Sequence, residues 1–339
     1  MAKLTEMIVG GGATPINGIE QFANAPVLHT DEENQVWLKA GNYSNDTTTY
    51  PDALTTVSGG NVNTASYITY GLVNMIDGSP TDIFVSKDGW KLYTISQSSR
   101  KIHEFQFEVQ NDISTLFYTN RVTTLSTTQT STPYAASFSD DLSKMYIAAY
   151  TKKRLVEYDL TTPGDITTAT YSGNFIDTST TINGPIGVHI SHDGTKIYGT
   201  DNQSNFVRQF NLVTPYDTST AVYSNKSFDM TQLASTQGSH MNEDESLLYG
   251  SSIANGYDRV YQYALSTPGD ISTASYTGKT FSFLSQSGNI YGIALSKFGV
   301  KMFGVDSSTY RVYEWDLSEV AIGILEEGDL DPNTYVRIK

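Results

Sequence analysis

The stretch that decides the fold is VHISHDGTKIYGTDNQSNFVRQFNL, which runs from Val188 to Leu212. Its apolar and aromatic residues fall into three short runs, which are separated by a tight turn and by a longer polar loop. Asp193-Gly194 suits a short hairpin, because Gly accepts a positive φ without steric cost. Aromatic and β-branched residues between the turns are typical of strands that are covered on both faces. The stretch therefore predicts three successive antiparallel strands.

The same pattern occurs five times along the chain. Equivalent positions in the five copies, at Lys91, Lys144, Lys196, Leu247 and Lys301, are 51 to 54 residues apart. The copies are Asp82–Phe107, Ala135–Leu160, Val188–Leu212, Gly238–Leu265 and Gly292–Leu317. A repeat of this length, with several short strands per unit, is the signature of β-propeller blades.

A fourth, outermost strand is predicted after each of the first four copies. Its segments are NDISTLFYTN (Asn111–Asn120), TPGDITTATYSG (Thr162–Gly173), TPYDTSTAVYSN (Thr214–Asn225) and TPGDISTASYTG (Thr267–Gly278). The acids Asp165, Asp217 and Asp270 stand alone in these segments, without the run of oxygen ligands that calcium needs. They therefore predict a turn that is capped by the Asp side chain before the strand begins.

The fifth copy has no such segment after it, but the chain carries one near its start. NTASYITYG (Asn63–Gly71) places Tyr67 19 residues before Ser86, much as Tyr171 lies 20 residues before Ser191. A strand from this segment would complete the last blade and remove a free sheet edge. We therefore predict an all-β fold, a five-bladed β-propeller with four-stranded blades whose ring is closed by an N-terminal strand.

Composition excludes several classes of protein. The chain has 339 residues, no Cys, and a formal charge of −15 from 21 Lys and Arg against 36 Asp and Glu. Disulfides, thiolate nucleophiles and Cys-ligated metal centres are therefore excluded. The negative charge argues against partners that are nucleic acids or anionic membranes. No stretch is apolar enough for a signal peptide or a membrane span, so we expect the protein to be made in a cytoplasm and not secreted by a general route.

The propeller is expected to span residues 61–320. Residues 1–60 do not repeat, and they contain three consecutive glycines and one plausible strand, NQVWLKAG. We expect them to form a docking or oligomerisation segment that orders against a partner. Residues 321–339 are expected to form a C-terminal tail, with an acidic bend and a last strand, TYVRIK.

Two resemblances to known proteins add to this interpretation. VWLKAGNYSNDTTTYPDAL near the start and TYVRIK at the end resemble segments that flank variable β-rich regions in structural proteins of tailed bacteriophages. The blade pattern S-x-D-G-x-K-x-Y … V-x-x-Y-x-L resembles the YVTN/lactonase-like group of bacterial and phage propeller repeats, over residues 65–317. The second resemblance implies the fold and no activity. The first implies a virion component, such as a tail or head fibre or a capsid decoration protein, which is multimeric and faces the host.

The loops between the second and third strands are expected to open together on one face of the propeller. Propeller faces are common ligand surfaces, and Tyr, Asn, Asp and Arg suit sugars, because they combine stacking planes with groups that bind hydroxyls. The alternative is that these loops are simply polar. The candidate ligand-binding residues are Tyr150, Asp201, Asn202, Asn255, Tyr257, Asp306, Tyr310 and Arg311.

Three residues are candidates for a site in the central channel. His189 and His240 occupy the same position in consecutive copies, and without a third protein ligand they predict packing or hydrogen bonding rather than a zinc site. Asp82 lies where the other copies have Ala135 or Gly, so it is a candidate channel acid. We find no Ser-His-Asp order, no metal-binding helix motif and no recurring carboxylate pair. No catalytic residue, metal or cofactor is therefore predicted.

These observations favour one function. We predict that the chain is a non-enzymatic virion structural protein, either a tail or head fibre or a decoration protein. It would display the propeller for binding to a host-surface glycan or receptor. We expect it to lie in the virion, to contact other virion proteins through residues 1–60, and to be a homo-oligomer with a trimer favoured. A first alternative is a propeller enzyme, lactonase-like or glycan-cleaving, with a channel site built from Asp82, His189 and His240. A second is a cytoplasmic scaffold that binds proteins on its disc face.

Overall fold

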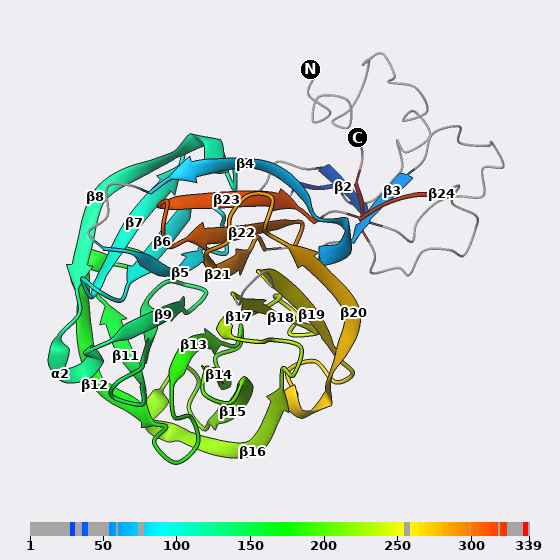
Figure 1. Ribbon diagram of the computed structural model, residues 1–339. Coiled ribbons are helices and arrows are strands. Elements are labelled where there is room, and N and C mark those ends of the chain that lie inside the picture. The colour runs from blue at the N-terminus through cyan, green and yellow to red at the C-terminus, as the bar shows by residue number, and fades with distance from the viewer. Residues whose placement is uncertain are drawn as a thin grey trace. The chain divides into compact units, whose positions relative to one another are not determined.

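The computed structural model contains two compact units, Gly59–Ser318 and a smaller one made of Met1–Ser58 together with Glu319–Lys339. The residues that the structure describes are 28–30, 36–39, 54–58, 60–73, 78–253, 258–297, 299–317, 319–323 and 335–337. In the larger unit, five four-stranded antiparallel sheets surround a common centre (Figure 1). This unit is a five-bladed β-propeller, as the repeats predict.

The inner strands of the blades surround the centre, and each contacts the next around the ring. They are β5 (Pro80–Val85), β9 (Pro133–Phe138), β13 (Pro185–Ile190), β17 (Thr236–Met241) and β21 (Ile290–Leu295). The second strands are β6 (Lys91–Ser96), β10 (Lys144–Ala149), β14 (Lys196–Asp201), β18 (Leu247–Ser252) and β22 (Lys301–Asp306). The third strands are β7 (Lys101–Phe107), β11 (Arg154–Leu160), β15 (Phe206–Leu212), β19 (Arg259–Leu265) and β23 (Arg311–Asp316). We number the blades 1 to 5 in this order.

The outer strands are β8 (Leu116–Thr124), β12 (Ala169–Asp177), β16 (Ala221–Asp229), β20 (Ala274–Ser282) and β4 (Ser66–Leu72). β4 precedes blade 1 in the chain but pairs with β23 of blade 5, with Tyr67 opposite Trp315 and Gly71 opposite Val312. The predicted closure of the ring by an N-terminal strand is therefore present. One short α-helix, α2 (Thr127–Thr130), follows β8.

A short 3-10 turn precedes each outer strand. The turns are η2 (Val62–Thr64), η3 (Ile113–Thr115), η4 (Ile166–Thr168), η5 (Thr218–Thr220) and η6 (Ile271–Thr273). The side chains of Asp165, Asp217 and Asp270 each accept a hydrogen bond from the backbone N–H two residues further on. The predicted side-chain-capped turns are confirmed. Asn61 caps η2 in the same way, which the sequence analysis did not anticipate.

One hydrogen bond recurs between successive blades and shows where the last blade begins. A second-strand Tyr hydroxyl donates to a backbone carbonyl in the outer segment of the next blade. The pairs are Tyr93–Gly164 (2.9 Å), Tyr146–Tyr216 (2.8 Å), Tyr198–Gly269 (3.0 Å) and Tyr249–Gly60 (2.7 Å). All four accepting residues have a left-handed backbone, with φ between 64° and 94°. Gly60 is therefore the first residue of the outer segment of blade 5.

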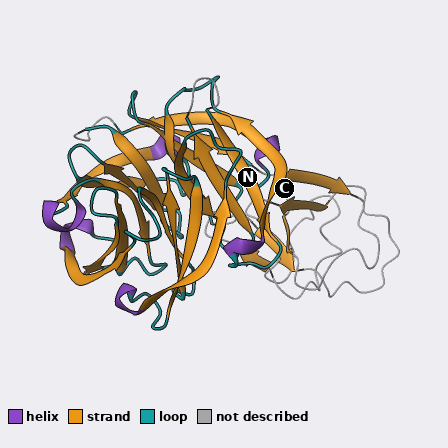
Figure 2. Cartoon of the chain, turned by 60° about the horizontal axis from the view of Figure 1, so that its bottom comes forward, coloured by secondary structure: helices purple, strands orange, loops and turns teal. Residues whose placement is uncertain are grey.

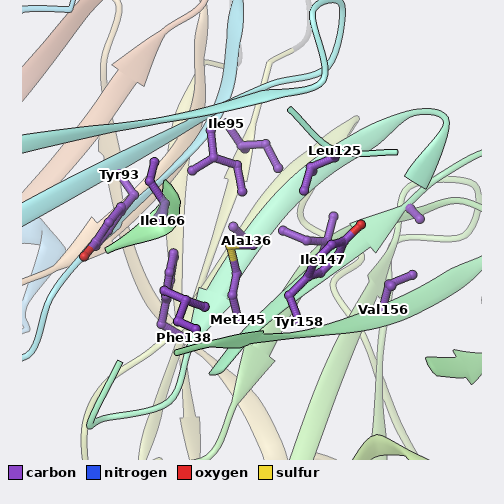
Figure 3. Packing of buried hydrophobic residues seen from close by; sticks show 13 residues of the cluster. Tyr93, Ile95, Leu125, Ala136, Phe138, Met145, Ile147, Val156, Tyr158 and Ile166 are labelled. Carbon is purple, nitrogen blue, oxygen red and sulfur yellow. The ribbon is translucent and has the colours of Figure 1, made fainter. Parts of the chain in front are cut away.

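Apolar side chains fill the spaces between the blades. Between blades 1 and 2, Tyr93 and Ile95 pack against Phe138, Met145 and Ile147 (Figure 3). The rings of Tyr93 and Phe138 are stacked, with centroids 4.5 Å apart. Because neighbouring blades cover both faces of each sheet, the inner three strands are buried almost throughout, polar residues such as Glu104, Glu157 and Glu314 included.

The smaller unit is a sheet to which both ends of the chain contribute. Its strand order is β1 (Leu28–Thr30), β2 (Val36–Lys39), β25 (Tyr335–Arg337), β3 (Leu54–Ser58) and β24 (Glu319–Gly323). β2 and β25 coincide with the strands predicted in NQVWLKAG and TYVRIK. Most of residues 1–60 lies outside the described residues, so the docking role of that segment stays a prediction. None of the described helices is long and apolar enough to cross a membrane.

Candidate ligand-binding face and central channel

The two faces of the ring differ in the loops that they carry. Strands alternate in direction within each blade, so the second-to-third-strand loops lie on the face where the inner strands begin, which we call the loop face. The hairpins that join the first and second strands lie on the opposite face, the hairpin face. Figure 2 shows an oblique view of the ring, with the connecting loops in teal at the ends of the strands.

Two candidate acids on the loop face hold its loops in place. The Asp201 carboxylate accepts hydrogen bonds from the backbone N–H groups of Gly184 (3.1 Å) and Gln203 (3.0 Å), and from the Ser204 hydroxyl (2.8 Å). Arg208 approaches the same carboxylate to 3.3 Å. Asp201 is only 2% exposed. Its carboxylate is therefore engaged within the protein, and it orders the loop between β14 and β15.

Asp306 occupies the equivalent position in blade 5 and has the same role. Its carboxylate accepts hydrogen bonds from the hydroxyls of Ser287 (2.6 Å) and Ser308 (2.7 Å) and from the N–H of Thr309 (3.0 Å). Burial opposes ionisation of this group, but these hydrogen bonds outweigh burial and lower the pKa of Asp306 below its ordinary value. Asp306 is therefore a charged loop anchor.

Asn202 lies beside Tyr150, because its side-chain oxygen accepts a 2.9 Å hydrogen bond from the same Gln203 amide that donates to Tyr150. The other loop-face candidates are dispersed. Tyr310 packs against the apolar cluster between blades 5 and 1. The Arg311 guanidinium lies over the ring of Tyr70, 4.3 Å from its centroid. Asn255 and Tyr257 lie outside the described residues.

Tyr150, in contrast, belongs to a cluster at the loop-face mouth of the channel. Its ring centroid is 5.6 Å from that of Tyr134, and its hydroxyl accepts a 2.9 Å hydrogen bond from Gln203. Burial raises the pKa of Tyr134, the nearby Tyr291 and Tyr150 raise it further, and a hydrogen bond with Gln97 acts in the opposite direction. All three tyrosines are partly exposed. We call Tyr134, Tyr150 and Tyr291 the tyrosine cluster.

Sequence reasoning found Tyr150 but missed the rest of this cluster. Tyr134 and Tyr291 are the second residues of β9 and β21, and the equivalent positions in the other blades hold Thr81, Ile186 and Gln237. Because the residue type at this position varies from copy to copy, the repeat does not indicate that a tyrosine cluster forms there. Only the ring geometry brings the two inner strands to the same mouth.

Asp82 lies below this mouth, in a layer that is otherwise made of Ala and Gly. Its Oδ2 accepts a hydrogen bond from the N–H of Ala136 at 3.2 Å. A Cβ atom on Gly292 would lie 2.3 Å from Asp82 Oδ1, so the glycine makes room for the carboxyl group. Burial raises the pKa of Asp82 well above its ordinary value, and hydrogen bonds from Ala136 and Ile83 only partly oppose that effect. Burial therefore disfavours the ionised form of this carboxyl group in the channel.

The two candidate histidines lie two residues after the Asp82 layer on their inner strands. This places them about 7 Å nearer than Asp82 to the hairpin face. The imidazoles of His189 and His240 have centroids 5.5 Å apart and cross edge to face. Burial lowers the pKa of His189 to about 3, with a contribution from His240, and burial alone lowers the pKa of His240 to about 4. Both rings are therefore neutral at pH 7. Among the described residues, no group of three or more His, Asp or Glu is arranged to hold a metal ion.

A charged ring surrounds the channel at the hairpin face. The Lys87 ammonium lies 3.0 Å from a carboxylate oxygen of Asp140, from one of Glu243 and from the His192 imidazole. His192 also contacts Asp140. The ring contains one residue from each blade. Each residue directly follows the Ser or Asn at the end of an inner strand, and the five are Lys87, Asp140, His192, Glu243 and Lys297. This regular position is a sequence signal that could have revealed the ring in advance.

The space beneath the charged ring is small. The cavity there has a volume of about 90 Å³, and its lining includes Phe84, His189 and His240. Ligand pockets for drug-sized molecules are several times larger, about 300 to 1,000 Å³. The hairpin-face end of the channel therefore contains a small cavity with room for water molecules.

Known proteins resemble this chain only distantly. No protein-family model matches the sequence, and no curated protein matches it. Similar solved structures, each with a TM-score of 0.44, include a protein of unknown function from Desulfotomaculum acetoxidans, which is 11% identical and matches over 77% of this chain and 76% of that one. A candidate 6-phosphogluconolactonase from Bacteroides uniformis is 16% identical over 84% and 82% of the two chains. The β-propeller domain of Cps50 (Swd1) from Myceliophteria thermophila is 11% identical over 74% and 99%.

Proposed function

We propose that this propeller is a non-catalytic display domain that binds a neutral polyhydroxylated ligand, a surface glycan, through its loop face. The tyrosine cluster is the observation that carries this proposal. Its rings offer planes on which a sugar can stack, and the neighbouring Gln97 and Gln203 amides both donate and accept hydrogen bonds, as hydroxyl groups require. The cluster contains no charged residue, which favours a neutral sugar over a phosphorylated one.

We further propose that the protein is a virion structural protein of the fibre or decoration type. This part of the proposal is supported by the resemblance of the two ends of the chain to segments of tailed-phage structural proteins. The smaller unit, to which both ends contribute, would attach the propeller to other virion proteins and set its copy number, with a trimer favoured. Several copies on one particle would bind a surface together, so weak binding at each site would suffice.

The ligand proposal is tested by binding measurements on matched tyrosine variants. A glycan array identifies the best ligand, and isothermal titration calorimetry then compares the wild type with Tyr150→Ala and Tyr276→Ala. We expect Tyr150→Ala to weaken binding by about tenfold or more, through the loss of one stacking ring. Tyr276 is the control, because it is 37% exposed on the outer strand β20, away from the channel. Equal losses in both variants, or no glycan bound at all, would remove the basis for a loop-face site.

The virion proposal has a separate test. Mass spectrometry of phage particles purified from a lysate is expected to detect this chain together with the known structural proteins. Its absence from the particles would refute the virion role, while the glycan measurement would stand by itself.

Asp82 supports one alternative, a hydrolytic channel site. A carboxyl group whose pKa is raised well above its ordinary value can serve as a general acid, and perturbed pKa values gather at functional sites. In that case, lactone or glycoside hydrolysis by the purified protein would fall by about a hundredfold or more in Asp82→Asn. An enzyme of this kind must turn over a substrate in solution, whereas a display protein needs only to bind one.

A further inference from the structure

The loop face carries a cation from every blade. Third strands begin at this face, and four of them have Lys or Arg as their first residue, while in blade 3 the cation comes two residues later. The five residues, all at least partly exposed, are Lys101, Arg154, Arg208, Arg259 and Arg311. A third strand lies two strand spacings, about 10 Å, outside the inner strand of its blade. The cations therefore surround the loop-face mouth of the channel.

Aromatic rings hold two of these guanidinium groups in place. Arg154 lies 3.9 Å from the centroid of the Phe175 ring, and Arg311 lies over the ring of Tyr70. A guanidinium that stacks on a ring can still donate hydrogen bonds from its edge to an anion. Both groups are therefore in position before a ligand binds. Arg208 differs, because it pairs with a buried acid of its own blade.

Few exposed acids oppose these cations. Among the described residues at the loop face, Asp201, Asp258 and Asp306 are only 2%, 5% and 1% exposed. Asp177 and Asp229, at the ends of two outer strands, are the acids with greater exposure. The loop that joins β10 to β11 adds two further lysines. We give the name basic rim to Lys101, Lys152, Lys153, Arg154, Arg259 and Arg311.

The hairpin face is acidic, because its turns use carboxylates as caps. Four of its hairpins have an Asp two residues after the strand-ending Ser or Asn, and each accepts a hydrogen bond from a backbone N–H of its own turn. These acids are Asp88, Asp141, Asp193 and Asp244. Four of the 3-10 turns at this face also follow a capping Asp, since Asp112 caps η3. The formal charge of −15 therefore describes the whole chain and not its loop face.

We propose that the basic rim binds the carboxylates of an acidic polysaccharide, while the tyrosine cluster holds a neutral sugar of the same polymer. This inference rests on the glycan-binding function proposed above. Its support is charge complementarity, because separate cations around an uncharged centre match a polymer that combines acidic and neutral units. Duplex DNA carries one charge for about every 1.7 Å of its axis and would require a denser row of cations.

The opposite charges of the two faces also orient the molecule as it approaches such a polymer. An anionic surface repels the hairpin face and attracts the loop face, so the loop face arrives first. This orientation acts over about 10 Å in 0.1 M salt, which is the Debye length. The net negative charge of the chain therefore does not exclude an acidic partner that meets the loop face.

Biolayer interferometry on immobilised polygalacturonate, a polymer of carboxylated sugars, tests the basic rim with the full chain. Neutral dextran and duplex DNA serve as comparison surfaces. The wild type is expected to bind polygalacturonate more tightly than either of them. Its dissociation constant should rise by about tenfold or more between about 50 and 200 mM salt, because released counterions favour binding only when salt is low.

Two double variants with the same net charge show whether the loop face is responsible. Lys152→Gln with Lys153→Gln removes two positive charges from the basic rim and should weaken binding to polygalacturonate by about tenfold. Val213→Glu with Val222→Glu adds two negative charges at the hairpin-face ends of β15 and β16, where the side chains are 78% and 58% exposed. Binding by this second variant should stay within about twofold of the wild type, because salt screens distant charges.

The remaining outcomes separate this inference from the glycan proposal. Tyr150→Ala should leave binding to polygalacturonate unchanged, because this polymer lacks the neutral unit, so the cluster and the rim can fail independently. Equal losses in the two double variants would make net charge, and not the loop face, the cause. Equal or tighter binding to DNA would assign the face to nucleic acid. Either result, or a wild type that binds polygalacturonate no better than dextran at low salt, overturns the inference.

Discussion

Asp82 is a single acid in a layer of the channel where the other inner strands carry Ala135, Gly187, Gly238 and Gly292. Its raised pKa makes the folded protein sensitive to pH in a predictable direction. An Asp in the unfolded chain loses its proton near pH 4, whereas the folded carboxyl keeps its proton to higher pH. Between these two pH values the folded state binds more protons than the unfolded state. The free energy of unfolding therefore falls as the pH rises through this window.

Asp82→Asn removes this dependence, because the amide is neutral at every pH. Relative to the wild type, its free energy of unfolding should rise from about pH 4 upwards, by at most about 1.4 kcal/mol per pH unit. Urea unfolding of both proteins at a series of pH values gives this difference directly. A difference that is constant with pH would show that the pKa of Asp82 is the same in the folded and unfolded states.

Closure of the ring is a property of one element, the segment that begins at Gly60 and continues into β4. Gly60 has a φ of +94°, and a Cβ atom there would lie 2.4 Å from the Tyr249 hydroxyl. Gly173 on β12 has a φ of +96°, but nothing lies within 4 Å of its Cβ position. Both substitutions by Ala strain the backbone by about 1–2 kcal/mol. Gly60→Ala should lower the free energy of unfolding by about 1–3 kcal/mol more than Gly173→Ala does, because it disrupts a buried hydrogen bond between blades 4 and 5.

Thermal and urea unfolding of Gly60→Ala and Gly173→Ala measure this difference under the same conditions. The additional loss of unfolding free energy in Gly60→Ala measures how much the contact between Tyr249 and Gly60 stabilises the closed ring. If the two variants unfold alike, the hydrogen bond from Tyr249 to Gly60 contributes little, and blade 5 is held mainly by the pairing of β4 with β23.

The whole molecule divides into two units, and this division makes a prediction about folding and assembly. Residues 59–318 contain all five blades with every outer strand, so this fragment should unfold cooperatively, close to the melting temperature of the propeller in the full chain. Residues 73–318 lack β4 and uncover the buried Trp315 and Tyr313, so this fragment should lose the cooperative transition. Circular dichroism on heating separates the two outcomes.

The same fragment tests the assembly role of the smaller unit. Light scattering on a sizing column should show that residues 59–318 lose any trimer that depends on the smaller unit. A fragment that keeps the trimer would place the trimer contact on the propeller and refute the assembly role proposed for residues 1–60.

The sequence alone predicted the architecture, for a physical reason. Every blade needs the same hairpin turn, the same capped 3-10 turn and the same apolar strands, so the pattern recurs every 51 to 54 residues. The pattern also revealed the displaced strand, because Tyr67 stands at the distance from Ser86 that the other copies require. Local chemistry, such as the Asp165 cap, was equally predictable, since its partner lies two residues away.

Only the tertiary structure decided how the candidate site is composed. Asp201 and Asp306 were expected to contact a ligand, but their carboxylates are engaged by neighbouring loop residues, which no spacing in the sequence indicates. The tyrosine cluster, the charged ring around Lys87 and the smaller sheet each combine residues from distant parts of the chain. Their contacts depend on how the blades pack around the axis. A repeat determines the shape of each blade, whereas the residues that meet at a mouth of the channel vary freely from copy to copy and become neighbours only when the ring closes.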